Sequence, residues 1–291
     1  MISINTNNGG LFAAKAASQS QAAIDSAMQR LSTGSRINNA KDDAAGQAIA
    51  TRLTAEIQGL EIASRNVADG QSLVDTAEGA LQETHTLLLR MREIGVQAAN
   101  GTLSTSDNQA LDAEFQQLVK EIDRIAQNTT WAGAALLNGD GGTVDTSETF
   151  SFQAGVGNNS GADVFDVTVK NADATTLDIY AEQTVGGVTS NSVGLLSQSS
   201  AQTAIGLVDT AIATVSSERA NLGAVSNRMA STMANLDQIR VNLTASKGRI
   251  ADADFAAETA NLAKGQILQQ AATAMLAQAN ASKQQVLTLI R

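Results

Sequence analysis

Few residues of this chain could carry out catalysis. The sequence contains one histidine, His85, and no cysteine, so it offers neither a two-histidine zinc site nor a cysteine nucleophile. No HExxH motif occurs, and Gly9-Gly10 and the glycines of 139–142 lack the Lys-Ser/Thr pair of a phosphate-binding loop. An enzyme is therefore disfavoured, and we predict no catalytic residue, no cofactor and no metal site.

The charge of the chain is negative and unevenly distributed. The net charge is −10, and the stretch from Gly139 to Ser200 has eight acidic residues against one basic residue, Lys170. This balance argues against a nucleic-acid partner, which needs a basic surface. The lack of a Lys/Arg-rich helix face likewise argues against a membrane partner. We interpret the acidic middle as a solvated surface, with a ligand or cation site as the alternative.

Two apolar repeats with a period of seven residues dominate the rest of the sequence. Such a repeat keeps one seam of a helix against a neighbouring helix. The first repeat runs through Leu53, Leu60, Val67, Val74, Leu81 and Leu88, and the second through Val208, Val215, Leu222, Met229, Leu236, Leu243 and Ile250. The spacing predicts two long helices, with His85 on the flank of the first seam.

The row next to the first repeat consists mostly of small residues. Three residues after each repeat position stand Glu56, Ala63, Gly70, Ala77, Thr84 and Met91. Small residues let helix backbones approach closely, which favours a bundle over a free two-stranded coil. A shorter apolar pattern over 111–125 predicts a third helix. We therefore predict a mainly α fold: an elongated antiparallel helical bundle or coiled coil with paired N- and C-terminal helices and a small central β-hairpin region.

The centre of the chain is expected to contain strands. Thr149–Val156 and Asp163–Val169 alternate apolar and polar residues on either side of the turn-forming Gly157–Gly161, which predicts a hairpin. Leu177–Ala181 is a further strand candidate. The stretch from Gly186 to Asn191 predicts a loop that leads into the next helix.

The two terminal segments, over 16–31 and 260–289, have helical apolar spacing and little charge. A lone helix of this kind is marginal in water, because its apolar face has nothing to bury against. We therefore expect both terminal helices to be loose in the free subunit and ordered by a partner. Other copies of the chain are the favoured partner, because head-to-tail contacts between copies generate open helical polymers.

Several motifs resemble those of bacterial flagellin. They are LSTGSRINNAKDDAAGQAIATRL at 31–53, NVADGQSL at 66–73, LRMREIGVQAANG at 89–101, EIDR at 121–124, and QILQQ, LAQAN and VLTLIR within 266–291. The resemblance covers about 140 residues at each end. It implies a structural subunit of the flagellar filament for swimming motility, secreted unfolded through the flagellar type III export channel and assembled at the filament tip outside the cell.

The resemblance also implies a division into domains. From the inside of the filament outward, these are a terminal-helix inner core (1–40 with 255–291), spoke connectors (41–54 with 246–254), a helical rod (55–138 with 197–245) and a short, variable, outward-facing β-hairpin region (139–196). The larger outer domains of longer flagellins would be missing.

Two sets of functional residues follow. The self-assembly interface is expected to include Ile24, Met28, Leu31, Arg36, Asp42, Asp43, Leu262, Leu268, Met275 and Leu289. Flagellins recognised by the vertebrate innate receptor use residues that match Arg90, Ile94 and Glu114, on a surface that also contacts the adjacent subunit. Ile94 stands where leucine is usual. Other implied partners are further flagellins, an export chaperone, the filament cap and hook-associated junction proteins.

Two other structural interpretations stay open. A hook–filament junction protein shares flagellin-like terminal helices but would not polymerise by itself into long filaments. The second interpretation is a coiled-coil surface protein or a secretion-needle protein. The motif at 31–53 and the length of 291 residues argue against it.

Overall fold

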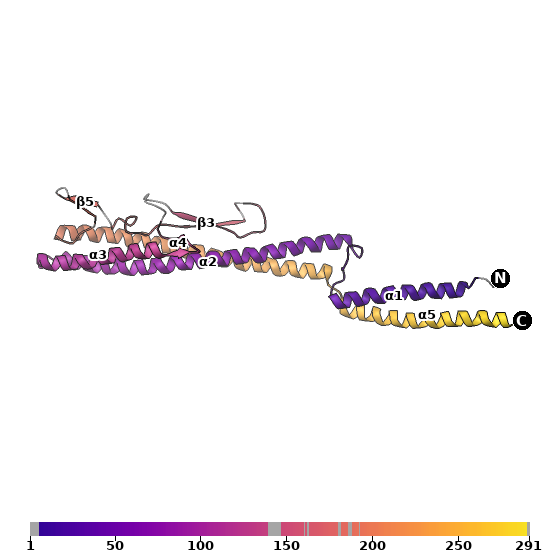
Figure 1. Ribbon diagram of the computed structural model, residues 1–291. Helices are drawn as coiled ribbons and strands as arrows, with labels where there is room; N and C mark the ends of the chain where they lie inside the picture. Colours follow the sequence, from indigo (N-terminus) through magenta and orange to yellow (C-terminus); the bar gives the residue numbers. More distant parts are fainter. Residues whose placement is uncertain are drawn as a thin grey trace. The chain divides into compact units, whose positions relative to one another are not determined.

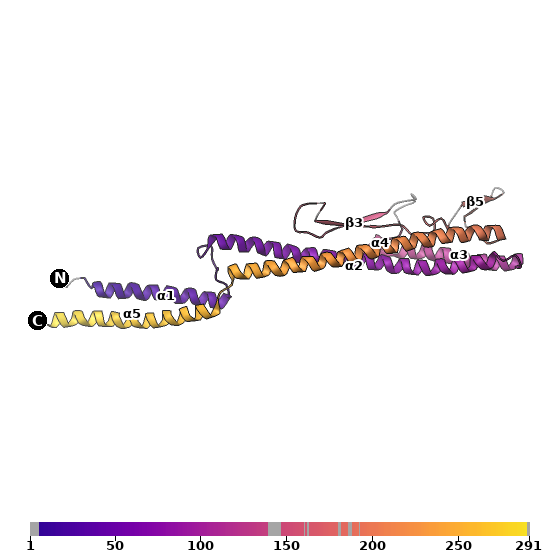
Figure 2. The same ribbon diagram turned by 180° about the vertical axis from the view of Figure 1, so that it is seen from behind.

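The computed structural model describes residues 6–138, 147–159, 161, 163–179, 182–185, 188–191 and 193–289. Within these residues the chain forms five helices: α1 (Asn8–Thr33), α2 (Ala44–Ala98), α3 (Thr105–Asn128), α4 (Gln198–Ala251) and α5 (Phe255–Leu289). The chain divides into two compact units, Met1–Gln58 with Arg240–Arg291, and Gly59–Ile239. The predicted fold class, mainly helical with paired terminal helices and small central strand pairs, is confirmed (Figures 1 and 2).

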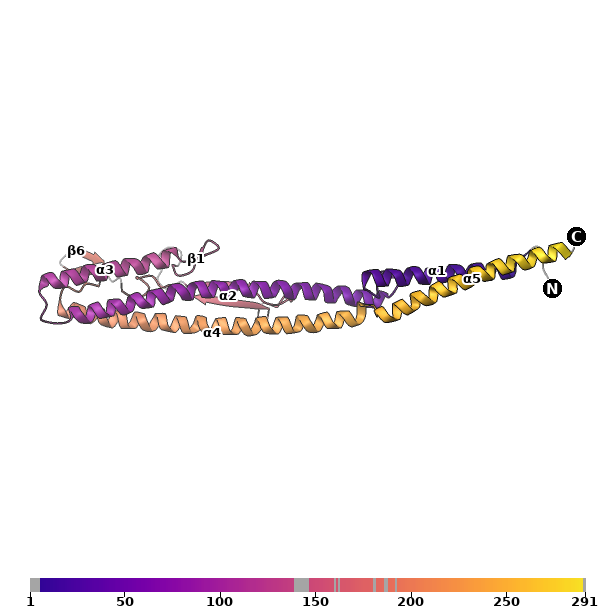
Figure 3. The same cartoon turned by 90° about the horizontal axis from the view of Figure 1, so that it is seen from below.

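In the second unit, α2 and α4 lie side by side and antiparallel (Figure 3). The residue numbers of the side chains that pair across them rise along one helix as they fall along the other. Arg92 Nε donates to Asp209 Oδ1 at 2.6 Å, and Arg219 Nε donates to Glu78 Oε1 at 3.0 Å. At about 1.5 Å per residue, the part of α2 from 59 to 98 spans on the order of 60 Å.

The heptad positions form the core of this unit. Leu60, Val67, Val74, Leu81 and Leu88 on α2 and Val208, Val215, Leu222, Met229 and Leu236 on α4 are all buried. Leu53, Leu243 and Ile250, which belong to the first unit, are only half-buried. His85 is half-buried between buried Thr84 and Leu88, on the flank of the seam as predicted.

The small residues of the α2 seam permit the close approach. Ala63, Ala77 and Thr84 are exposed by 2% or less. A Cβ atom added at Gly70 would lie 2.8 Å from Met229 Cε and 3.1 Å from the Phe152 ring. Gly70 therefore lies at a point where side chains of α4 and of the central hairpin leave no room for a larger residue on α2.

The third helix, α3, begins earlier than its apolar pattern indicates. Ser104 caps it: its hydroxyl accepts from Asp107 N at 3.2 Å, and the Asp107 carboxylate accepts from Ser104 N at 3.1 Å. Along its length α3 buries Phe115, Val119 and Ile122.

The central strands form three antiparallel pairs. The predicted hairpin is confirmed as β3 (Glu148–Gln153) with β4 (Val164–Val169), where Phe150 faces Val167 and Phe152 faces Phe165. A shorter pair, β1 (Thr130–Trp131) and β2 (Ala134–Ala135), turns through left-handed backbone at positions 132 and 133. The third pair is β5 (Glu182–Val185) with β6 (Val188–Asn191).

Two predictions for the centre are wrong. Leu177 and Asp178 lie in a turn rather than a strand, because Asp178 takes a left-handed φ of 55° that breaks extended structure. Residues 180 and 181 of that candidate lie outside the described part. The predicted loop of 186–191 instead contains β6, since Val188–Asn191 pair in register with β5; Gly186 and Gly187 are not described.

Helix carboxylates bind the segment between α3 and α4, residues 129–197, which is called the outer segment below. Asp123 on α3 accepts from Ala174 N at 2.8 Å, Asp112 accepts from Leu195 N at 2.8 Å, and Glu218 on α4 accepts from Lys170 N at 3.3 Å. Burial raises the pKa of Asp123, against the opposing effect of its backbone hydrogen bond. Because the bonds go to backbone amides, they place few demands on the sequence of the outer segment.

The helices extend into the expected connectors. Of the predicted stretches 41–54 and 246–254, only 41–43 and 252–254 lie outside helices. Asp43 explains the early start of α2, because its Oδ1 accepts from Gly46 N at 2.8 Å and so caps the first turn.

Two glycines of α2 should respond oppositely to alanine. Gly79→Ala is expected to raise the free energy of unfolding by about 0.5–1 kcal/mol, because a Cβ atom there meets nothing within 4 Å. Gly70→Ala should lower it, because overpacking against Met229 and Phe152 costs about 1–3 kcal/mol. Urea titration followed by circular dichroism measures both. Equal gains would show that Gly70 is not a close-approach site.

Candidate functional site

The first and last helices of the chain pair along their length. Figures 1 and 2 show α1 and α5 lying side by side. The polar contacts that join them are Asn7 Nδ2 to Ala279 O at 3.3 Å and to Asn280 Oδ1 at 3.1 Å, Gln269 Nε2 to Gln21 Oε1 at 2.6 Å, and Arg30 Nη1 to Glu258 Oε1 at 2.9 Å. Their order shows that the two helices are antiparallel.

The apolar core of this pair is thin. Its buried members are mainly Ala13, Ala27, Ala272 and Ile24. A Cβ atom at Gly265 would lie 2.8 Å from Ile24 Cγ1, so the missing side chain of Gly265 makes the room that Ile24 fills. Ile24 was expected at the surface between subunits, but it is 6% exposed and packs within its own subunit.

Large apolar side chains of the pair face solvent instead. Exposed by 48–75% are Leu11, Phe12 and Met28 on α1, and Phe255, Ile267, Leu268 and Met275 on α5. Scattered exposed apolar residues are ordinary, but Phe12, Leu268 and Met275 line one groove between the two helices, which is typical of an interaction surface.

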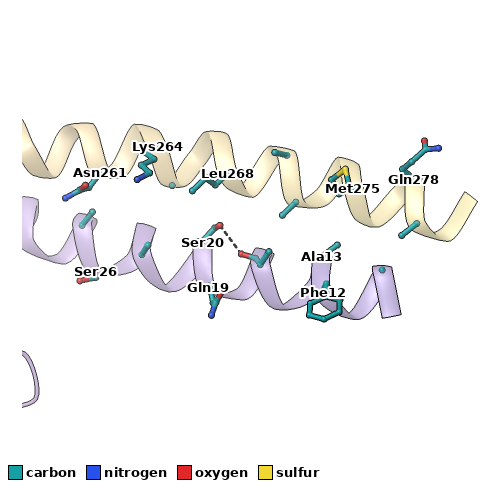
Figure 4. A pocket seen from close by; sticks show the side chains of 18 of the residues that line it. Phe12, Ala13, Gln19, Ser20, Ser26, Asn261, Lys264, Leu268, Met275 and Gln278 are labelled. Carbon is teal, nitrogen blue, oxygen red and sulfur yellow. Dashed lines mark hydrogen bonds between the residues drawn. The ribbon is translucent and has the colours of Figure 1, made fainter. Parts of the chain in front are cut away.

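A groove runs between α1 and α5 (Figure 4). Its volume is about 1010 Å³, and most of its lining residues are alanine, glycine or serine. Phe12, Leu268 and Met275 add the larger apolar side chains. The Ser20 hydroxyl donates to Ala16 O at 2.9 Å, so this polar group in the groove is already satisfied. Small lining residues would let the backbone of another helix approach closely.

One buried carboxylate anchors the pair at the start of α5. Glu258 is 8% exposed and accepts from Arg30, with a longer bond of 3.4 Å from Asn261 Nδ2. It also lies in the first turn of α5, where the helix dipole favours negative charge. Sequence reasoning missed this pair. An acidic residue in a first turn was the available signal, but nothing in the sequence indicated its partner 228 positions away.

Backbone hydrogen bonds join the two stretches between helices, residues 34–43 and 252–254, which are called the connectors from here on. Arg36 N donates to Ala251 O at 2.7 Å, and Ala253 N donates to Gly34 O at 2.9 Å. Gly34 itself has a φ of 70° and ends α1 in the left-handed conformation that glycine favours. The segment that follows α1 and the segment that precedes α5 therefore pair with each other as an antiparallel β-bridge between Ser35 and Asp252.

The charged residues of the connector form hydrogen bonds with nearby backbone groups. Asp42 Oδ2 accepts from Asn39 N at 3.0 Å and from Asn38 N at 3.2 Å. The Asn39 bond is the main reason why the pKa of Asp42 is lowered. Arg36 donates to Ile250 O at 2.7 Å and lies 3.8 Å from Asp43. These hydrogen bonds and this ion pair hold the connector in shape, and the predicted contact of Arg36, Asp42 and Asp43 with neighbouring subunits stays a prediction.

The remaining predicted interface residues are spread over the pair. Met28, Leu268 and Met275 are exposed, and the latter two line the groove. Leu31 and Leu262 are half-buried. Leu289 ends α5, but its side chain lies outside the described part of the chain.

The second predicted surface lies on α2 and α3. Arg90 Nη2 donates to Glu114 Oε1 at 2.8 Å, a bond that raises the pKa of Arg90, and Nη1 donates to Glu93 Oε2 at 3.0 Å. Ile94 does not belong to this surface. It is 1% exposed, because it follows Met91 by three residues and points into the helical core.

No group of three or more histidine and acidic residues in the described part of the chain could hold a metal ion. None of the helices described is both long and apolar enough to cross a membrane.

Comparison with known proteins gives consistent matches over nearly the whole chain. Residues 4–141 match the bacterial flagellin N-terminal helical region, and residues 205–290 match the bacterial flagellin C-terminal helical region. The flagellin of Halalkalibacterium halodurans is 44% identical and covers 91% of each chain. That of Bacillus subtilis is 40% identical and covers 99% of each.

Among solved structures, one described as a flagellar hook-associated protein from Vibrio parahaemolyticus covers 72% of this chain and 100% of its own, with a TM-score of 0.58. Its sequence identity of 15% makes this a likeness of fold alone.

Breaking the buried ion pair should loosen α1 and α5. Arg30→Ala leaves Glu258 buried without its charged partner, which we expect to cost about 1–3 kcal/mol. Hydrogen exchange of amides in α1 and α5 should become faster. The control is Arg65→Ala, because Arg65 and Glu61 form an exposed pair within one helix that is worth little. Unchanged exchange in Arg30→Ala would contradict the anchoring role.

Proposed function

The chain belongs to the bacterial flagellin family, and we infer that it is a structural subunit that polymerises into the flagellar filament. The observation that carries this inference beyond family membership is the exposed apolar surface of the α1–α5 pair. We infer further that this filament lies outside the cell and serves swimming motility. The family is structural, and no catalytic role is assigned.

The junction-protein alternative has less support. The relatives that match this chain over 91% and 99% of its length are flagellins. The likeness to a hook-associated protein concerns fold, since terminal helical pairs can be shared between filament and junction proteins. Growth of long filaments by the purified chain separates the two functions.

We propose that a second copy of this chain fills the groove between α1 and α5. Burying apolar surface stabilises a contact by roughly 25 cal/mol per Å². The seven exposed apolar side chains of the pair would contribute this free energy if a second surface covered them. Another copy presents the same small-residue helices, which fit a groove lined by alanine, glycine and serine. For the polymer to stay open, the groove of one copy must receive a different face of the α1–α5 pair of the next copy, because only such a heterologous contact repeats without closing into a dimer.

Within this proposal the predicted interface residues have different roles. Met28, Leu268 and Met275 contact the neighbouring copy directly, with Leu31, Leu262 and Leu289 at the margins. Ile24 acts indirectly, because it holds α1 against Gly265 of its own chain. Arg36, Asp42 and Asp43 set the connector geometry from which the pair projects.

Secretion through an export channel is compatible with this design. The thin core of the α1–α5 pair makes it easy to open, and the absence of proline removes slow isomerisation on refolding. Before assembly the exposed surface must be covered, which is the role we assign to an export chaperone. The filament cap, hook-associated junction proteins and other flagellins would meet the same surface at the filament ends or along it.

The Arg90–Glu114 surface is proposed as a second contact with the adjacent subunit, and as the place where the vertebrate innate receptor would bind. Arg90 and Glu114 are each about half exposed, with side-chain values of 52% and 45%. Since Ile94 is buried, the apolar part of this surface would have to come from exposed neighbours such as Leu89 and Val96.

Removing the terminal helices should abolish assembly. A variant lacking residues 1–40 and 255–291 is expected to stay folded in the second unit but not to extend short filament seeds, whereas the intact chain should grow long filaments. Light scattering and electron microscopy measure growth. If neither form grows on seeds, the junction-protein alternative becomes the better one.

A charge placed in the groove should have the same effect without deletion. Leu268→Asp or Met275→Asp is expected to abolish filament growth, because assembly would bury an unpaired carboxylate at a cost of several kcal/mol. The second unit should remain folded by circular dichroism. Gln270→Asp, on an exposed position of α5 that does not line the groove, is the matched control. Normal filaments from either groove variant would contradict the proposed contact.

A further inference from the structure

The loop between α2 and α3 contains an asparagine followed by glycine. Asn100 and Gly101 are both exposed and lie outside the two helices, which end at Ala98 and begin at Thr105. Neither residue has a role in the proposed function. Because glycine has no Cβ atom, it shields its own backbone nitrogen less than any other residue does.

The carboxamide of Asn100 is folded over the peptide bond that follows it. Thr102 N donates to Asn100 Oδ1 at 3.4 Å, which places the Asn100 side chain on the side of the Gly101 nitrogen. The nearest atom to a Cβ built at Gly101 would be Gln198 Oε1, at 3.8 Å. Both residues are exposed, so the site is open to water.

We propose that Asn100 is a site of spontaneous deamidation in the folded protein. The Gly101 backbone nitrogen loses its proton to solvent base and attacks Asn100 Cγ; a C–N bond forms, and the amide nitrogen of the side chain leaves as ammonia. Water then opens the resulting five-membered imide at either carbonyl. One product is aspartate, and the other is isoaspartate, in which the backbone passes through the former side chain.

Both products change the α2–α3 loop. Each adds a negative charge just after the C-terminal end of α2, where the helix dipole disfavours it. Isoaspartate also lengthens the backbone of the loop by one methylene group. The chain has two further Asn-Gly pairs: Asn8–Gly9 lies in the first turn of α1, and Asn138–Gly139 reaches into residues that the structure does not describe.

Ageing of the intact subunit tests the proposal. The native chain is incubated at mildly alkaline pH, and peptides are mapped by mass spectrometry for replacement of the side-chain NH₂ by OH, with isoaspartate detected by isoaspartyl methyltransferase labelling. A sample in denaturant, which frees every Asn-Gly pair, gives the reference rate. We expect the Asn100 peptide to convert in the native protein, and to convert faster as pH rises.

Gly101→Ala is the matched variant, because the added Cβ atom has ordinary room and Gly101 has no left-handed φ. It should lose the conversion while circular dichroism shows an unchanged fold. Should that variant fail to fold, Asn100→Gln serves instead, since its longer side chain closes the ring poorly. Conversion of Asn100 in the denatured but not in the native chain would overturn the proposal, as would undiminished conversion in Gly101→Ala.

Discussion

A pair of helices has no interior, because each helix can bury only the stripe that faces the other. In α1 and α5 the apolar part of that stripe consists of alanine, glycine and one isoleucine, while seven large apolar side chains of the two helices remain in solvent. The shortage of buried surface is not a defect of the sequence. It leaves apolar surface on both helices available for the contact with a second copy that we propose.

The second unit solves the same problem within one chain. Two long helices bury their heptad seams, α3 covers a third side with Phe115 and Ile122, and the outer segment adds Ile179 and Leu195. Small residues in the α2 row bring the backbones close, which raises the number of dispersion contacts that each large residue makes. Carboxylates of α3 and α4 then bind backbone amides of the outer segment. The surface segment can thus vary in sequence and still dock, because its hydrogen bonds do not depend on its side chains.

The repeating patterns of apolar residues predicted the long helices and the central hairpin. The seven-residue repeats predicted both long helices and their buried faces, and the alternation of apolar and polar residues predicted the β3–β4 hairpin, but not the register in which its strands pair. Partners distant in sequence were missed, since neither Arg30–Glu258 nor the Gly34–Ala253 bond leaves a local pattern. Ile94 and Ile24 were misplaced for a related reason. A family resemblance can place a residue in an interface although its side chain points into the core. The direction of the side chain depends on its position around the helix relative to the buried residues.

The contacts of the α1–α5 pair are unequal along its length. At the connector end a buried carboxylate meets Arg30 at 2.9 Å, and two backbone bonds of 2.7 and 2.9 Å join the connectors. At the other end Asn7 makes neutral side-chain bonds of 3.1 and 3.3 Å, and the shorter of the two is exposed. Charge-assisted, buried bonds resist opening more than exposed neutral ones do. We therefore expect the helices to separate more easily at the Asn7 end than at the connector end, so that the groove could widen for the proposed second copy while the Arg30–Glu258 bond stays in place.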